Sequence, residues 1–150
     1  MQSLKTEGVV ELAINDDPNR VISFVPDDIL FAERFYKLLS TLKTKEAEYK
    51  QRSDELSQNK RVDEYGIPET APESLALLHE LCDSMRADID IVFGKGTSQK
   101  VFGEHLSLYM IEQFFKGITP YVQSVRQEKT RKYTEPVKAR REIELKKSLE

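Results

Sequence analysis

The feature that most constrains the fold is a long helical segment, apolar on one side in its first half and charged in its second. From Asp27 to Leu42 the apolar residues recur at the spacing of one helix face. After Leu42 that face thins, yet pairs such as Glu46 and Lys50 keep the i,i+4 orientation that supports a helix. Continued to Leu56, the helix would be about 45 Å long. We therefore expect its second half to project beyond the core of a 150-residue chain.

Two interpretations of this projecting arm, residues 43–61, are open. Six apolar residues along the whole helical segment, from its first half into the arm, share one a/d register, which Lys45 and Arg52 interrupt. They are Phe31, Phe35, Leu38, Leu42, Tyr49 and Leu56. In the first interpretation the arm is surrounded by solvent. In the second it packs against another copy of the chain or against a partner, and Tyr49 and Leu56 are the candidate self-association residues.

Two short β-favouring runs precede the helix, Val9–Ile14 and Val21–Phe24. The residues between them, Asn15–Arg20, include Asx side chains and a proline, which favour turns. We predict a β-hairpin with a longish loop. Because an isolated hairpin is marginally stable in water, it must pack on the helices or add strands across a subunit boundary. The candidate self-association residues of the hairpin are Val10, Leu12 and Ile22.

Three further helices are predicted after a linker at Asn59–Ala71. They run from Thr70 to Phe93, from about Glu104 to Lys116, and from Thr119 onwards. Pro72 suits the first turn of the second helix, Gly117 ends the third, and Thr119 is the N-cap of the fourth. The predicted fold is therefore mainly α. It comprises a β-hairpin arm (residues 1–25), a four-helix domain with one long projecting helix (26–133) and a charged tail (134–150).

The segment Phe93–Gly103 contains glycines and lysines and invites comparison with a phosphate-binding loop. A P-loop needs a strand, then two glycines with four residues between them, followed directly by Lys and Ser or Thr, then a helix. Here Gly94 and Gly96 bracket a single lysine, and the residues before them have helical spacing. We therefore predict a helix–helix connection in which Gly94 caps the second helix with a positive φ.

No other constellation indicates a catalytic or metal centre. His79 and Cys82 have helical i,i+3 spacing, but a structural zinc site requires four ligands. We interpret Cys82 as a buried residue and His79 as a surface residue. Asp83, Asp88 and Asp90 are interpreted as a solvated acidic face, with Asp88 and Asp90 pointing apart. The sequence contains no Gly-x-Ser-x-Gly motif, and we expect neither an enzyme nor a cofactor.

Charge is distributed unevenly along the chain. Residues 124–150 carry nine Lys or Arg and five Asp or Glu; subtracting these from the totals of 23 and 26 leaves a net charge of −7 on residues 1–123. An acidic body with a basic tail argues against a dedicated nucleic-acid-binding domain. One cysteine precludes an intrachain disulfide. No signal peptide and no apolar run of membrane-spanning length is visible.

Four segments of the chain carry a resemblance to a known family. They are Val9–Phe24, Pro26–Tyr36, Phe93–Gly103 and Phe114–Tyr121. These segments resemble the tail assembly chaperones of long-tailed, siphovirus-type bacteriophages and prophages, or the proteins of tail gene clusters that fill that role. The resemblance spans about Val9 to Tyr133, and its motifs carry no known chemistry.

The resemblance implies a non-catalytic protein that is mainly helical and self-associating. Such chaperones coat the long apolar tape-measure protein in the host cytoplasm until tail-tube subunits displace them, and they are absent from the finished virion. A helical groove can accept an amphipathic helix through i, i+3, i+4 and i+7 contacts. Candidate partner-binding residues are Phe102, Leu106, Tyr109, Met110, Phe114 and Tyr121. The alternative is a structural tail-completion or connector subunit, and a nucleic-acid-binding regulator that uses the basic tail is a third possibility.

Overall fold

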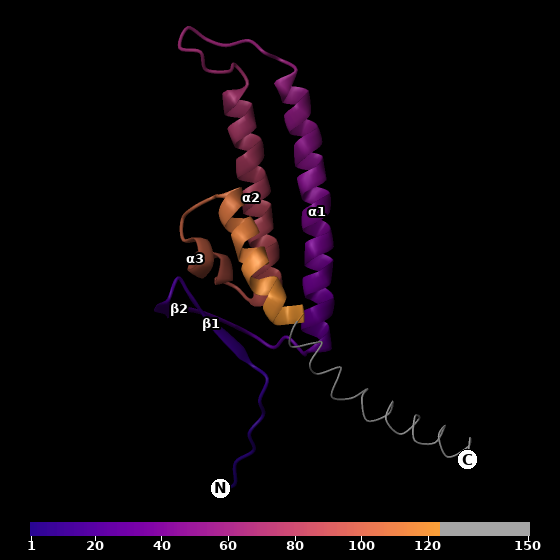
Figure 1. Cartoon of the computed structure of the whole chain (residues 1–150), viewed down its shortest axis with the longest axis vertical. Coiled ribbons are helices and arrows are strands. Elements are labelled where there is room, and N and C mark those ends of the chain that lie inside the picture. Colours follow the sequence, from indigo (N-terminus) through magenta and orange to yellow (C-terminus); the bar gives the residue numbers. More distant parts are fainter. Residues whose placement is uncertain (124–150) are drawn as a thin grey trace, which may run out of the picture.

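The computed structural model describes residues 1–123, which form two strands and four helices (Figure 1). The elements are β1 (Val10–Ile14), β2 (Asp17–Phe24), α1 (Ile29–Ser57), α2 (Ala71–Phe93), α3 (Thr97–Phe102) and a helix over residues 108–123. The predicted class, a mainly helical chain with an N-terminal hairpin, is confirmed. The predicted tail (134–150) and the end of the predicted helical domain (124–133) lie outside the described residues.

The hairpin turn is tighter than the sequence suggested. Asn15 and Asp16 alone connect the strands, and both have positive φ, 51° and 62°. Asn and Asp tolerate this left-handed conformation better than most side chains. The loop predicted over Asn15–Arg20 is therefore wrong from Asp17 onwards, because β2 already begins there.

Residues 18–20 form a bulge inside β2. The ladder pairs Ile14 with Asp17 but Ala13 with Val21, so the three residues between have no partner on β1. A bulge accommodates Pro18, which has no N–H to donate to a ladder. The turn-forming residues that suggested a long loop are thus divided between a two-residue turn and a bulge.

α1 begins at Ile29 rather than at Asp27, because Asp28 is its N-cap. The Asp28 carboxylate accepts a hydrogen bond from the backbone N–H of Leu30, with 3.0 Å between nitrogen and oxygen. This bond satisfies one of the donors that a helix start leaves unpaired.

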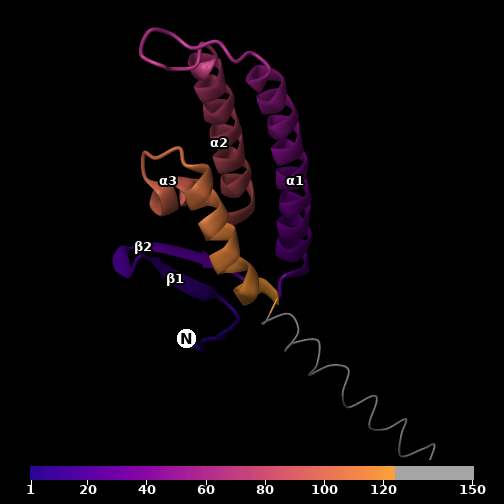
Figure 2. The ribbon, with the colours of Figure 1, turned by 45° about the horizontal axis from the view of Figure 1, so that its top comes forward.

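α1 and α2 lie side by side and antiparallel, and the pair extends beyond the hairpin and the shorter helices (Figures 1 and 2). The long helix therefore projects, but α2 accompanies it. Tyr49 packs against the core and is half-buried, and Leu56 lines a cleft with Leu77 of α2. Neither interpretation of the arm anticipated this: its neighbour is a later helix of the same chain.

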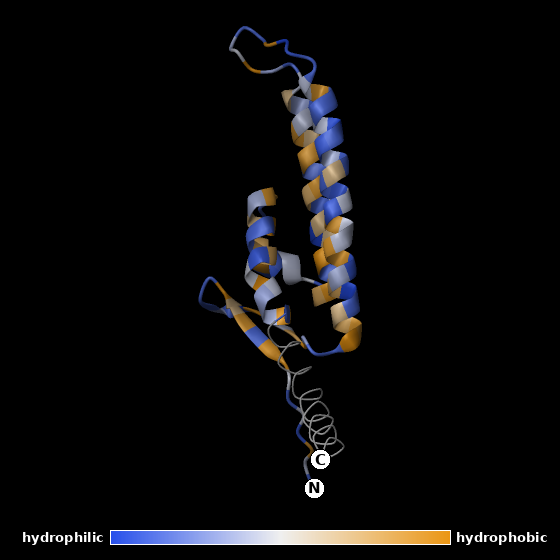
Figure 3. Cartoon of the chain, turned by 45° about the vertical axis from the view of Figure 1, so that its right-hand side comes forward, coloured by the Kyte–Doolittle hydropathy of each residue, from blue (hydrophilic) through white to orange (hydrophobic). Residues whose placement is uncertain are grey.

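The predicted linker between these helices is confirmed as a loop, and it has internal structure. Val62 and Pro68 form an isolated antiparallel bridge. The Asp63 carboxylate accepts hydrogen bonds from the backbone N–H groups of Tyr65 and Ile67, at 2.9 and 3.0 Å. Most of the loop is hydrophilic (Figure 3).

The predicted third and fourth helices are wrong in their boundaries. Residues 108–123 form one uninterrupted helix, so Gly117 does not end a helix and Pro120 lies inside one. Thr119 is not an N-cap: its hydroxyl donates to the Phe115 carbonyl, 2.6 Å away, one turn earlier. The additional helix is α3, which forms inside the segment that was predicted to be a connection.

One hydrophobic core joins the hairpin to the helices. Its buried members from β2, α1, α2, α3 and the 108–123 helix include Ile22, Phe24, Phe35, Leu38, Met85, Ile89, Phe102, Phe114 and Ile118. The half-buried Phe93 packs against this core, and its ring makes edge-to-face contacts with Phe24, Phe31, Phe35 and Phe114, with centroids 5.4–6.1 Å apart. The predicted hairpin arm is thus part of the helical domain's core.

Candidate functional site

α3 is held at its N-terminal end by Asp90 of α2. The Asp90 carboxylate accepts a hydrogen bond from the Ser98 backbone N–H at 2.7 Å and another from the Ser98 hydroxyl at 3.1 Å. A carboxylate next to the first N–H groups of a helix is favourable because those groups carry partial positive charge. Asp88 points to the other side of α2, where it pairs with Lys45 of α1. The two aspartates do point apart, but each has a partner, so the predicted solvated acidic face is wrong for Asp88 and Asp90; Asp83 is exposed, as predicted.

Two arginines bind the carbonyl groups at the other end of α3. Arg20 of β2 donates to the Lys100 and Val101 carbonyl oxygens at 2.8 and 3.0 Å. Arg86 of α2 donates to the Gly103 and His105 carbonyl oxygens, both at 2.8 Å. A cation is favourable at the C-terminal end of a helix. Three charged side chains from two elements therefore position this six-residue helix.

The glycine-rich segment serves this geometry. Gly94 ends α2 with φ 111°, and Gly96 is the N-cap of α3 with φ 88°. Both values lie where side chains with a Cβ are disfavoured. The prediction that Gly94 caps the second helix with a positive φ is confirmed. The Lys100 ammonium group donates to the Val21 carbonyl at 3.3 Å, which ties the segment to the hairpin.

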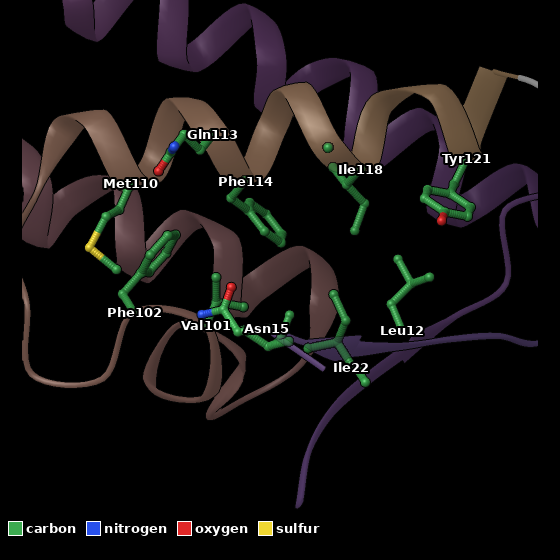
Figure 4. A pocket seen from close by; sticks show the side chains of 13 residues that line it. Leu12, Asn15, Ile22, Val101, Phe102, Met110, Gln113, Phe114, Ile118 and Tyr121 are labelled. Atoms are coloured by element: carbon green, nitrogen blue, oxygen red, sulfur yellow. The ribbon is translucent and has the colours of Figure 1, made fainter. Parts of the chain in front are cut away.

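An apolar groove of about 430 Å³ lies between the hairpin, α3 and the 108–123 helix (Figure 4). Among the described residues, its lining includes no acidic, basic, histidine or cysteine side chain. The lining residues are Leu12, Ala13, Ile14, Asn15, Ile22, Val101, Phe102, Met110, Gln113, Phe114, Gly117, Ile118 and Tyr121. Such a surface offers apolar contact and two amide side chains.

One side of the groove is a single stripe of the 108–123 helix. Met110, Gln113, Gly117 and Tyr121 recur at intervals of three or four residues and therefore share a face. Gly117 is exposed, and a Cβ added to it would meet no atom within 4 Å. A helix-interior glycine costs roughly 0.5–1 kcal/mol relative to alanine. Packing within the described chain does not account for this glycine.

Four of the six predicted partner-binding residues line the groove: Phe102, Met110, Phe114 and Tyr121. Phe102 and Phe114 are mostly buried, at 2% and 9% exposure, so they contribute to the core as well. Leu106 is half-buried against the core, outside the groove lining. Tyr109 is 68% exposed and also lies outside the lining.

The predicted self-association residues fall in three places. Leu12 and Ile22 line the groove, and Val10 packs half-buried on the core. Ile22 is only 4% exposed, which leaves it almost no surface for a second copy. Tyr49 and Leu56 lie on α1 beside α2, away from the hairpin.

Histidine and cysteine take the places expected from the helical pattern. His79 is on the surface of α2 and lies 3.0 Å from the Asp83 carboxylate. Cys82 is fully buried, and burial raises the pKa of its thiol, with a further upward contribution from the Asp83 charge. Within residues 1–123 no three His, Cys, Asp or Glu side chains are grouped as metal ligands would be.

Fold and groove together define a small helical protein with an N-terminal hairpin and an uncharged apolar groove. The chain belongs to a family of unknown function, DUF6673, whose profile matches residues 20–145. No curated protein and no solved structure matches the chain. None of the helices in residues 1–123 combines the length and apolar character that crossing a membrane requires.

Proposed function

We propose that this chain is a non-catalytic tail assembly chaperone of a long-tailed bacteriophage or prophage. In this proposal it binds apolar helical stretches of the tape-measure protein in the host cytoplasm until tail-tube subunits displace it, and it is absent from the mature virion. Support comes from the resemblance of the four sequence segments described above and from the uncharged apolar lining of the groove.

The observation that carries the proposal is the exposed glycine in the groove wall. Without a side chain at Gly117, the backbone of another helix can come close to the 108–123 helix. Met110 and Tyr121 flank the glycine on the same stripe, and a flexible thioether and an aromatic ring both suit the binding of varied apolar partners. An amphipathic helix would insert its apolar side chains between this stripe and Leu12.

The test is co-expression with a tape-measure fragment that is insoluble alone. Wild-type chain in excess is expected to keep the fragment soluble and to co-purify with it. Gly117→Leu fills the groove and should abolish co-purification. Glu112→Leu adds the same side chain to an exposed position of the same helix, outside the groove lining, and should leave it unchanged.

Stability measurements separate binding from folding in this experiment. Gly117→Ala should raise the free energy of unfolding by roughly 0.5–1 kcal/mol because alanine favours the helix, while weakening capture of the fragment. A fragment that stays insoluble beside excess wild-type chain contradicts the proposal. So does a Gly117→Leu variant that captures it as well as Glu112→Leu does.

The second candidate is a structural tail-completion or connector subunit. The observation in its favour is the outer edge of β1, which no other strand covers within residues 1–123. Mass spectrometry of purified particles distinguishes the two candidates. A connector is present in stoichiometric copies in mature tails, whereas a chaperone is absent from them.

A further inference from the structure

The two outer edges of the hairpin are protected to different degrees. The edge of β2 is interrupted by the bulge that contains Pro18, and α3 lies against it. Arg20 reaches across this edge to the carbonyl groups of α3, and Lys100 reaches back to the carbonyl of Val21. Bulges, prolines, lysines and covering helices are the features that prevent an edge strand from pairing with another chain.

The edge of β1 has none of these features within residues 1–123. In the described part of the chain β1 pairs with β2 alone, and it lies on the side of the hairpin away from α3 (Figure 2). Its five residues include no proline and no lysine, and Glu11 is its one charged residue. Val10, Leu12 and Ile14 are half-buried on one face of the strand, and Glu11 and Ala13 are exposed on the other.

We propose that two copies of the chain join edge to edge through β1, as a four-stranded antiparallel sheet centred on Leu12. This inference rests on the backbone edge of β1 and not on the proposed chaperone function, although Leu12, Ala13 and Ile14 also line the groove. It gives the unpaired backbone groups of β1 their hydrogen-bond partners and converts a two-stranded sheet into one of four strands, which is more stable. A twofold axis closes the contact, so the assembly stops at a dimer.

The alternation of β1 selects the register. Residues directly opposite each other point to the same face, so the apolar residues must lie opposite one another. Centring the pair on Glu11 would place two carboxylates opposite each other, and centring it on Ala13 would pair only residues 12–14. Centring on Leu12 pairs the whole strand: Val10 lies opposite Ile14 of the second copy, and Glu11 lies opposite Ala13 of the second copy.

A second copy is the occupant that fits this edge best. Its own β1 has the matching length and places no like charges opposite each other. An extended segment of another protein could pair with the same backbone groups. In a sample of the pure protein, however, only pairing between two copies makes the dissociation constant depend on the sign of a charge at position 13. This difference makes the proposal testable.

The test is sedimentation equilibrium of the full chain carrying charge variants at Ala13. Wild type is expected to reach twice its monomer mass of 17.4 kDa. Ala13→Glu places two symmetric pairs of like charges in the dimer and should raise its dissociation constant by about 2- to 30-fold. Ala13→Lys faces Glu11 of the second copy and should lower it. Within the monomer position 13 lies opposite Val21, so the two variants should melt alike.

A charge swap tests the register itself. Adding Glu11→Lys to Ala13→Glu restores opposite charges across the contact and should return the dissociation constant to the wild-type value or below. A wild-type chain that remains monomeric overturns the proposal. It is equally overturned if Ala13→Glu and Ala13→Lys change the dissociation constant in the same way, since another surface then holds the assembly. Because Ala13 also lines the groove, capture of a tape-measure fragment is measured only with the wild-type chain and the Gly117 and Glu112 variants, so either proposal can fail alone.

Discussion

Replacing Asp90 with alanine tests whether a single side chain of α2 holds α3 and, with it, one wall of the groove. Asp90 satisfies the backbone N–H and the hydroxyl of Ser98, and Ser98 is only 4% exposed. Both donors therefore lose their partner in Asp90→Ala without gaining water. Val101 and Phe102 of α3 line the groove, so any shift of this helix also changes the groove.

The expected loss of stability follows from these two hydrogen bonds. A buried donor left without a partner costs roughly 1–3 kcal/mol, and loss of a helix N-terminal cap costs roughly 0.5–2 kcal/mol. These two costs are not additive, because the Ser98 N–H is counted in both of them. We expect Asp90→Ala to lower the free energy of unfolding by about 2–3 kcal/mol. Asp90→Asn keeps an acceptor but loses the charge, and should cost about half as much.

Urea unfolding followed by circular dichroism measures this difference, and a double-mutant cycle with Ser98→Ala isolates the hydroxyl bond. Ser98→Ala should destabilise wild type by about 1 kcal/mol and the Asp90→Ala variant by much less, because the partner of its hydroxyl is already gone. A loss below about 0.5 kcal/mol for Asp90→Ala would refute the reasoning, since α3 would then be held by its apolar contacts and the arginines alone.

Two further predictions concern α1 and α2. Lys45 donates to Ser84 and Asp88 in a partly buried contact, so Lys45→Met should lower the free energy of unfolding by roughly 1–3 kcal/mol; adding Asp88→Leu should recover part of that loss in the same urea titration. Because the Cys82 thiol is buried with a raised pKa, a thiol reagent should label native protein at least about 100-fold more slowly than urea-unfolded protein. As the pH rises, the thiol of the unfolded chain loses its proton before the thiol of the folded chain does. The contribution of Cys82 to the free energy of unfolding should therefore be complete below the ordinary thiol pKa and should be lost as the pH rises through the raised pKa of the folded state. Cys82→Ala should remove this dependence of the free energy of unfolding on pH. Equal rates of labelling for native and unfolded protein would contradict the burial of the Cys82 thiol.

Secondary structure was predictable where local sequence decides it. The hairpin, the long helix and the second helix follow from apolar periodicity, from turn residues such as Asn15 and from Pro72 in the first turn of the second helix. Predictions failed where a residue type has two uses. Gly117 and Pro120 usually end helices, but the 108–123 helix continues through both, because its face of Ile111, Phe114, Ile118 and Val122 is buried in the core.

The groove was only partly predictable, because it depends on contacts between distant residues. Helical spacing identified Met110, Phe114 and Tyr121 as apolar positions, but it could not place Leu12 opposite them. α3 was missed because its six residues have little helical tendency by themselves. The signal was present in the chain: Asp90 and Arg86 interrupt the apolar pattern near the end of α2, where each binds a backbone group of the following segment.

The sequence alone determined the fold class, the long charged helix and the glycine cap at residue 94. It also showed that the glycines of Phe93–Gly103 lack the spacing of a phosphate-binding loop. Each of these features depends on residue spacing within one segment. Tertiary structure decided what those segments do together. It placed α2 along the charged arm, paired Lys45 with Asp88, covered the edge of β2 with α3, and left the edge of β1 and the glycine stripe of the 108–123 helix uncovered within residues 1–123. The reason is physical: which side chains are buried, paired or exposed depends on neighbours far away in the chain, and residue spacing carries no information about those neighbours.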